Sequence, residues 1–296
     1  MPILFAPSLG SFADLSGGVA LPDGHPSAVA WGVTVANGLT SARAHLLGAL
    51  NWSGELWTEG TRAATGNTGV WVGAIDTITL LDGSTAKTFT GSAAFQINTT
   101  THAPSTDPLT VSAVFNVYAY VSGGSLAFQA VTTAPDPANL RWKTGATGTH
   151  RFLGAFITDS AGLPVPFSTA RGVTLLRRDE DTANTLVLAS GTTPATPETF
   201  TLTGLVPYAA REILLRIELD ASATAEDYLE VYRSVSSLLQ THTVRAAAGG
   251  LNSETAWVPV EPFATFGTSF PKFTYVGGNV AAFTMELRGW RLGGSP

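Results

Sequence analysis

Residues 212–220 read Glu-Ile-Leu-Leu-Arg-Ile-Glu-Leu-Asp, and their alternation is the clearest structural signal in the chain. Every second residue is a branched aliphatic one, namely Ile213, Leu215, Ile217 and Leu219, whereas Arg216, Glu218 and Asp220 fall on the opposite phase. Side chains of a strand point alternately to the two faces of a sheet. The stretch therefore predicts a strand with one buried face and one largely solvated face.

Other segments repeat this strand-and-turn pattern on both sides of residues 212–220. Val114–Val121 alternates, Gly123-Gly124 favours a tight turn, and Leu126, Phe128 and Ala130 return on alternate positions, which predicts a hairpin. A second run, Val70–Leu81, is rich in Val, Ile and Thr and is closed by the turn dipeptide Asp82-Gly83. Further strands are expected at residues 152–157, 174–177, 185–189, 200–202 and 281–292.

Residues 224–240 fit two kinds of element. Tyr228, Val231, Tyr232, Val235 and Leu239 have helical spacing, and Thr224 with Asp227 resembles a capping box. Leu229 and Val231 also fit a short strand. We favour a strand, because the neighbouring segments are strands with turn signals roughly every 8–12 residues, a spacing typical of sandwiches and barrels.

These patterns predict an all-β fold, with β-sandwich or jelly-roll-like domains and an extended N-terminal arm. The arm is expected over residues 1–30, where Pro2, Pro7, Pro22 and Pro26 interrupt any helix or long strand. A β-rich first domain is expected over residues 31–135. Pro135 and Pro137 then mark a boundary, and an outward-facing C-terminal β-sandwich domain is expected over residues 136–296.

Composition narrows the classes of function. Hydrophobic residues make up 44% of the chain and charged residues only 13%, which excludes a disordered chain and favours surfaces that are buried against partner subunits. The net charge is −6 and the basic residues are dispersed, so we expect no nucleic-acid partner. There is no cysteine, no basic leader and no apolar run of about 20 residues. We therefore expect that the protein does not insert into a membrane and that it is assembled in the bacterial cytoplasm.

The stretch from Val117 to Phe167 carries a resemblance. A hairpin with aromatic residues is followed by Thr-Ala-Pro-Asp-Pro, by Arg151-Phe152-Leu153-Gly154, by a Thr158-Asp159-x-x-Gly162 turn and by a Pro166-Phe167 exit. It is similar to a module of fibre and spike proteins of tailed phages and gene-transfer-agent-like particles. The similarity extends over about residues 112–220. Its residues have folding roles: Gly154 permits a bulge or a close approach, and Asp159 with Gly162 suits a tight turn.

The residues do not point to catalysis, and we expect no enzyme, no cofactor and no metal site. There is no Gly-x-Ser-x-Gly motif, and the five histidines are scattered. The acidic run Asp179-Glu180-Asp181 is interpreted as a solvated turn rather than a Ca²⁺ site. A glycan depolymerase remains an alternative, since it needs only two suitably spaced carboxylates among 22 acidic residues.

Candidate binding residues lie in the last third of the chain: Trp257, Tyr275, Glu286, Arg288 and Trp290. Exposed rings stack on sugars, and charged side chains fix the sugar hydroxyls. On strand alternation Thr284, Glu286, Arg288 and Trp290 share one face, opposite Phe283, Met285 and Leu287. Such a face is either a ligand platform or a contact with a neighbouring subunit, and the low charge of the chain favours the contact.

The resemblance implies a virion protein, a tail fibre or a head spike, that mediates host attachment. The expected partners are identical copies in a homo-oligomer, capsid or tail proteins bound through the N-terminal arm, and host cell-surface polysaccharide. A trimer is favoured, and a pentamer fits a fivefold vertex. The alternative is an internal particle protein, such as a spike base, baseplate adaptor or capsid decoration protein, that binds no receptor. The sequence does not decide between head and tail.

Overall fold

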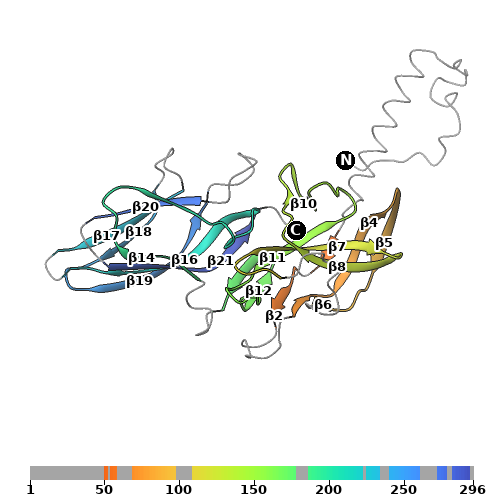
Figure 1. Ribbon diagram of the computed structural model, residues 1–296, viewed down its shortest axis with the longest axis horizontal. Coiled ribbons are helices and arrows are strands. Elements are labelled where there is room, and N and C mark those ends of the chain that lie inside the picture. Colours follow the sequence, from red (N-terminus) through yellow and green to blue (C-terminus); the bar gives the residue numbers. More distant parts are fainter. Residues whose placement is uncertain are drawn as a thin grey trace, which may run out of the picture. The chain divides into compact units, whose positions relative to one another are not determined.

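The computed structural model describes residues 50–52, 54–58, 69–97, 109–177, 186–222, 225–233, 240–260, 272–278 and 282–293. All of them belong to one unit, Gly48–Pro296. They form strands that pair antiparallel in separate sheets (Figure 1), so the predicted all-β fold is confirmed. The arm expected over residues 1–30 lies outside the described residues, as does the acidic run 179–181.

The largest sheet contains nine strands and is centred on the segment that dominates the sequence. Ile213, Leu215, Ile217 and Leu219 are all fully buried, whereas Asp220 on the opposite phase is exposed, as predicted. The sheet order is β19 (Leu251–Pro259), β16 (Ala210–Asp220), β21 (Ala282–Leu292), β13 (Val173–Leu176), β12 (Phe167–Ala170), β2 (Leu56–Thr58), β3 (Val70–Val72) and β6 (Phe95–Ile97), with β14 (Val187–Thr192) also paired to β21.

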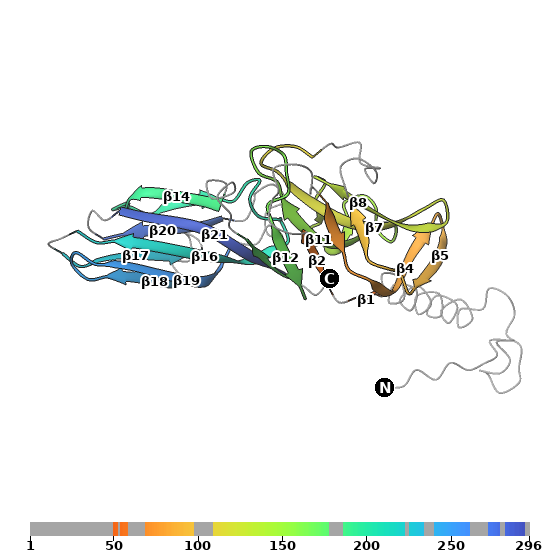
Figure 2. The same cartoon turned by 90° about the horizontal axis from the view of Figure 1, so that it is seen from below.

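A four-stranded sheet packs against the buried side of β16 and β21 (Figure 1), and Figure 2 shows the strands of the two sheets overlapping face-on. Its order is β15 (Glu198–Thr201), β20 (Lys272–Gly277), β17 (Asp227–Tyr232) and β18 (Gln240–Ala246). The Tyr275 ring of β20 lies 5.6 Å from the Phe283 ring of β21, so aromatic side chains fill the space between the two sheets. The ambiguous segment is a strand over residues 227–232, which confirms that prediction for β17, and residues 234–239 lie outside the description.

A five-stranded sheet has the order β8 (Ser125–Val131), β7 (Val114–Ser122), β11 (Arg151–Ile157), β10 (Asn139–Lys143) and β9 (Pro135–Asp136). The predicted hairpin is confirmed in β7 and β8, which pair from Asn116↔Val131 to Ser122↔Ser125. Both turn glycines, Gly123 and Gly124, have positive φ. The boundary expected between residues 135 and 136 falls inside this sheet, because β9 and β10 lie beside β11.

A three-stranded sheet joins β1 (Leu50–Trp52), β4 (Ile75–Asp82) and β5 (Thr85–Thr90). The turn predicted at Asp82-Gly83 is present, with Asp82 paired to Thr85 and Gly83 at a φ of 61°. The run predicted as one strand over Val70–Leu81 is divided, because β3 pairs in the nine-stranded sheet and β4 in this one.

The positions that carry the resemblance hold the sheets together. The register of β11 against β7 shifts between Phe152 and Gly154, which is the bulge that the glycine predicted. A Cβ at Gly154 would overlap the Leu56 side chain of β2, so the missing side chain lets β11 approach the nine-stranded sheet. The Phe156 and Phe167 rings stack 6.1 Å apart and bridge β11 to β12.

The predicted turn after β11 is confirmed as well. The Asp159 carboxylate is buried and its Oδ1 accepts hydrogen bonds from Ala161 N (2.8 Å) and Leu163 N (3.0 Å). Gly162 closes the turn with a φ of 76°. An aspartate that bonds backbone two and four residues ahead is a folding device, because it satisfies amides that the turn would otherwise bury without partners.

Candidate functional site

The outer face of β19, β16 and β21 brings together three of the five predicted binding residues. Trp257 lies on β19, and Glu286 and Arg288 lie on β21, with β16 between them. We call this surface the platform, and it is formed by the outward side chains of Leu175, Glu212, Leu214, Arg216, Glu218, Trp257, Glu286, Arg288 and Arg291.

The charges of the platform are neutralised within the sheet. Glu286 is only 3% exposed and accepts a hydrogen bond from Arg288 Nη2 at 2.6 Å, while Arg216 Nη1 lies 3.6 Å from the same carboxylate oxygen. Arg216 also pairs with Glu218. A carboxylate with so little solvent exposure needs such partners, because burial penalises an isolated charge by several kcal/mol.

The remaining platform arginine is paired and stacked. Arg291 forms an ion pair with Glu212, its direct cross-strand neighbour. Its guanidinium carbon lies 4.5 Å from the centroid of the Trp257 ring. This cation–π contact holds the half-buried indole against β16, so Arg291 has a structural partner on each side.

Between these charges runs a row of neutral residues. Leu175, Gly289, Leu214 and Trp257 are consecutive cross-strand neighbours on β13, β21, β16 and β19. Leu175 is 45% exposed and Leu214 and Trp257 are half-buried. Gly289 has no side chain, and a Cβ there would overlap the Thr174 carbonyl oxygen. The row is a shallow apolar strip with charge pairs on both sides.

The sequence prediction that Trp290 shares the polar face with Glu286 is wrong. Trp290 is fully buried and pairs with Ile213 and Thr174 on the core side. The cause is a bulge in β21: Leu215 pairs with Leu287 and Leu214 with Gly289, so Arg288 is an extra residue. One extra residue inverts the alternation beyond it.

Tyr275 also lies away from the platform, on β20 of the other sheet. It is 6% exposed, its ring packs against Phe273 and Phe283, and its hydroxyl donates to Glu198 Oε2 at 2.9 Å. Burial, followed by the bond to Glu198, raises the pKa of Tyr275 to about 12. Its ring belongs to the core of the sandwich and is not a surface for stacking a ligand.

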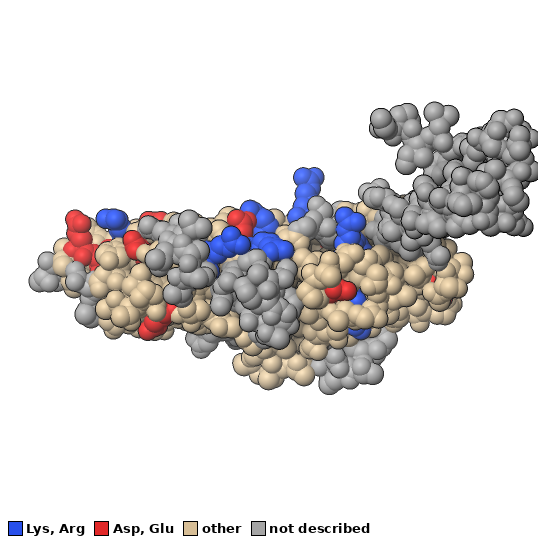
Figure 3. Space-filling model, turned by 90° about the horizontal axis from the view of Figure 1, so that it is seen from above, with Lys and Arg blue, Asp and Glu red and all other residues tan. Residues whose placement is uncertain are grey.

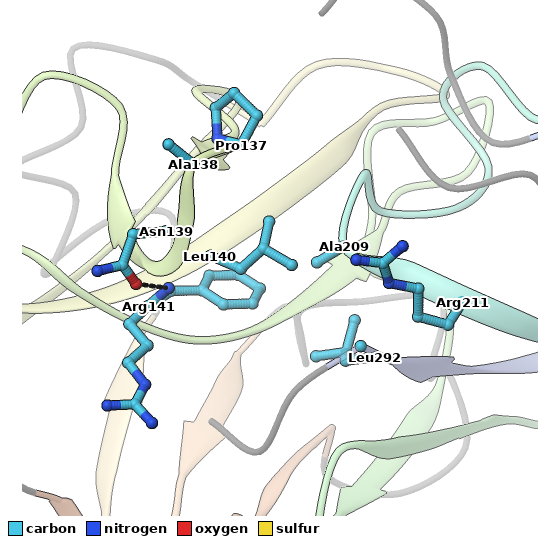
Figure 4. Close-up of a pocket in the computed structure, with 10 residues that line it drawn as sticks. Pro137, Ala138, Asn139, Leu140, Arg141, Ala209, Arg211 and Leu292 are labelled. Carbon is cyan, nitrogen blue, oxygen red and sulfur yellow. Dashed lines mark hydrogen bonds between the residues drawn. The ribbon is translucent and has the colours of Figure 1, made fainter. Parts of the chain in front are cut away.

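A second feature, which the sequence did not indicate, is a groove beside the β9–β10 hairpin. It has a volume of about 350 Å³, and Pro137, Leu140, Phe152 and Leu292 give it an apolar lining. Its polar lining comes from Asn139, Arg141 and Arg211 (Figure 4). Arg211 is the extra residue of another bulge, between Ala210 and Glu212, at the start of β16.

The two arginines of the groove differ from those of the platform. Neither Arg141 nor Arg211 has a carboxylate within ion-pair distance among the described residues. Asp136, the acid closest in sequence to Arg141, is not part of the lining, and its Oδ1 accepts a hydrogen bond from Ala138 N at 2.9 Å. Glu212, which follows Arg211, pairs with Arg291. In Figure 4 the Arg211 guanidinium is turned toward Ala209, while Arg141 extends away from Leu140 and Leu292.

Backbone contacts fix both arginines at their Cα atoms. The Arg211 carbonyl accepts from Val260 N at 3.0 Å, and its side chain occupies the space that a Cβ at Gly293 would take. The Arg141 amide donates to Asn139 Oδ1 at 3.3 Å, which orients the Asn139 amide nitrogen away from it as a donor.

Further basic residues lie on β10 and at β11, the strands that supply Arg141 and Phe152 to the groove. Arg151 is 2% exposed, donates to the Arg141 carbonyl at 3.5 Å and lies 5.9 Å from the Trp142 ring centroid. Burial, and then the charge of Arg141, lower the pKa of Arg151 to about 10. Burial and the charge of Lys143 likewise lower the pKa of His150. Figure 3 shows basic side chains gathered over the middle of the side on which β10 lies in Figure 1.

Two further features are absent from the part of the chain that the structure describes. No group of three or more His, Cys, Asp or Glu side chains there is arranged to hold a metal ion. No helix there is long and apolar enough to cross a membrane.

Comparisons with known proteins give a weak likeness. No protein-family model matches the chain, and no curated protein matches it. Among solved structures, the chain is similar to PBSX exported protein XepA, with 18% sequence identity, a TM-score of 0.23 and coverage of 48% of this chain. The chain spans about half of that protein, 50% of its length. A likeness at this level assigns neither a fold family nor a function.

Proposed function

We propose that the chain is a structural subunit of a tailed-phage or phage-like particle, a fibre or spike that attaches the particle to polysaccharide on the host surface. The main support for the proposal is that the residues that resemble the fibre and spike module have structural roles in this fold. Gly154 and Phe167 bring the five-stranded sheet against the nine-stranded one, and Asp159 fixes the turn that follows β11. The characteristic residues of this module have structural roles, as expected for a protein that forms a rigid β fibre or spike.

The platform supports assembly with identical copies. It carries both signs of charge, already paired, around an apolar strip that contains Leu175, Leu214 and Trp257. Paired charges need no counter-charge from a partner, and a strip of this kind is compatible with a symmetric contact between equal surfaces. Several weak receptor sites on one oligomer would then act together through their high effective concentration.

The test is to locate the chain and to measure what it binds. Antibodies against the chain should label particles produced by the bacterium that encodes it, at a fibre or spike. The purified full chain should run as a homo-oligomer in native mass spectrometry and should bind host cells or their isolated polysaccharide. Unlabelled particles would contradict the proposal. Labelled particles without host binding would instead identify an internal structural protein.

A further inference from the structure

The groove between the β9–β10 hairpin and the start of β16 has the composition of a binding site. Its volume of about 350 Å³ lies at the small end of the roughly 300–1,000 Å³ that is usual for ligand sites. Apolar side chains form much of the lining, and polar residues from two distant segments border it: Asn139 and Arg141 from β10, and Arg211 from β16, whose guanidinium is the one turned toward the lining in Figure 4. Such sites use the apolar part for contact area and the polar groups for orientation.

The polar groups of the groove favour an anion. The side-chain groups of Arg141 and Arg211 are donors without an acceptor function, and the Asn139 carbonyl oxygen is occupied by the Arg141 amide. The side chains therefore offer donors to a ligand, and that ligand has to bring acceptors. Guanidinium groups match carboxylate and phosphate oxygens with two parallel hydrogen bonds, which makes an oxyanion the best complement.

The surroundings strengthen this preference. Arg151 donates to the Arg141 carbonyl, and the charge of Arg141 contributes to the lowered pKa of Arg151. The charge of Lys143 likewise contributes to the lowered pKa of His150. Basic groups are thus close together here, in a chain whose net charge is −6. Gathering cations costs free energy in the empty protein. A bound anion offsets that cost and gains more from each cation near the partly desolvated lining than it would in water.

We propose that this groove binds the acidic group of a polysaccharide, with the oxyanion at Arg211 and Asn139, Arg141 closing on it from the solvent side, and a sugar ring against Phe152 and Leu292. The assignment rests on the proposed function, which supplies the class of ligand. The shared chemistry is an oxyanion attached to a sugar chain, and its two sources are a carboxylate, as in uronic acids, and a phosphate diester.

The experiment measures binding of defined probes to the full chain by isothermal titration calorimetry. The probes are oligogalacturonate for the carboxylate, poly(glycerol phosphate) for the phosphate, and dextran as the neutral control. We expect at least one acidic probe to bind, binding to weaken as salt is raised, and dextran not to bind. The better acidic probe identifies the source. Failure of both acidic probes, or equal binding of dextran, overturns the proposal.

Variants separate the groove from general charge. Arg211→Ala and Arg141→Ala should each weaken acidic-probe binding about tenfold or more, since each removes a charge-assisted hydrogen bond. Arg211→Lys should lie in between, because it keeps the charge and loses the planar fork. Arg245→Ala is the matched control: it removes an exposed arginine from β18, outside the lining, and should leave binding unchanged.

The outcomes also distinguish the two proposals. Equal loss of binding in Arg245→Ala and Arg211→Ala would show a net-charge effect and overturn the groove site. Particle labelling and host binding that persist in Arg211→Ala would leave the proposed function standing and remove the groove from it. Circular dichroism melting curves of each variant check that the loss of binding is not a loss of folding.

Discussion

The platform and the groove contain the same residue type in two electrostatic conditions. On the platform Arg216, Arg288 and Arg291 each meet a glutamate, and Arg291 also covers Trp257. In the groove Arg141 and Arg211 meet none among the described carboxylates. Arginines with internal partners stabilise the sheet and present a nearly neutral surface, whereas arginines without them retain their charge for a ligand.

In this chain of low charge, the residues available to bind a ligand are not those on the most polar strand face. Three of the five residues selected from the sequence lie on the platform, and each has a partner within the sheet: Glu286 pairs with Arg288, and Trp257 lies under Arg291. The unpaired cations come from segments that no sequence pattern connected. In this fold, the most polar strand face has a structural role in the sheet, and the groove beside it has the free hydrogen-bonding capacity.

The largest expected effect is at the seam between β21 and β13, which joins β19, β16 and β21 to the rest of the nine-stranded sheet. Gly289→Ala would place a Cβ onto the Thr174 carbonyl oxygen, where β21 pairs with β13, and neither backbone is free to retreat. We expect a loss of about 3 kcal/mol in the free energy of unfolding, measured by urea denaturation. A second unfolding transition would show that this seam alone couples the unfolding of β19, β16 and β21 to that of the rest of the nine-stranded sheet.

The control for the seam is Gly83→Ala in the β4–β5 turn. Gly83 also has no side chain, but a Cβ there meets nothing within 4 Å and the cost is only that of a φ of 61°. We expect about 1–2 kcal/mol. If both alanine variants lose the same free energy, contact with Thr174 does not hold the seam.

A smaller effect is expected from breaking the paired state of the platform. Glu286→Gln keeps an acceptor for Arg288 and removes the charge that two guanidiniums share. We expect the free energy of unfolding to fall by about 2 kcal/mol, since a nearly buried ion network loses its only central anion. Urea denaturation of Glu218→Gln, a more exposed member of the network, should show less than about 0.5 kcal/mol.

The corresponding substitution in the groove should have little effect on the free energy of unfolding. Because Arg211 has no described carboxylate partner, Arg211→Ala should change stability by less than about 0.5 kcal/mol. A destabilisation as large as that of Glu286→Gln would mean that Arg211 has a structural role like the platform arginines, and the contrast between the two regions would be lost.

The smallest effect concerns His150, whose pKa is lowered by burial and by the charge of Lys143. NMR titration should give a value below the ordinary 6.5, and Lys143→Met should raise it toward that value, whereas Arg245→Ala should not. The unfolded chain then takes up the proton first, so the contribution of neutral His150 to stability is present above pH 6.5 and is lost as the pH falls toward its lowered pKa. An unchanged pKa in Lys143→Met would remove Lys143 from the cationic cluster.

Much of the fold was predictable because the information is local. The hydrophobic alternation of Ile213, Leu215 and Ile217 predicts one buried face whatever packs on it, and Gly123-Gly124 forms a tight turn without help from distant residues. Asp159 and Gly162 are another case, since the aspartate carboxylate accepts hydrogen bonds from backbone amides of its own turn. For these segments the period of the side chains or the chemistry of the turn decides the conformation.

The candidate site was less predictable, because one misplaced residue changes a whole face. Trp290 and Arg288 share a phase in an ideal strand, and only the bulge at Arg288 turns Trp290 into the core. Gly289 is the signal that was present, since a glycine inside a strand pattern often marks a bulge. Pro135 lies in β9, at the edge of the five-stranded sheet, because a proline is compatible with a short edge strand as well as with a linker.

The chain's local chemistry thus accounts for its class, its strands and its turns, because each depends on a few neighbouring side chains and on backbone torsion angles. Sheet order, strand register and the choice of partner for each arginine depend on residues far apart in the chain, and only the packed sheets decide them. Arg141 and Arg211 become neighbours of one groove because β10 and the bulged start of β16 are brought to the same place. Whether an arginine is neutralised or left charged is a property of that three-dimensional neighbourhood.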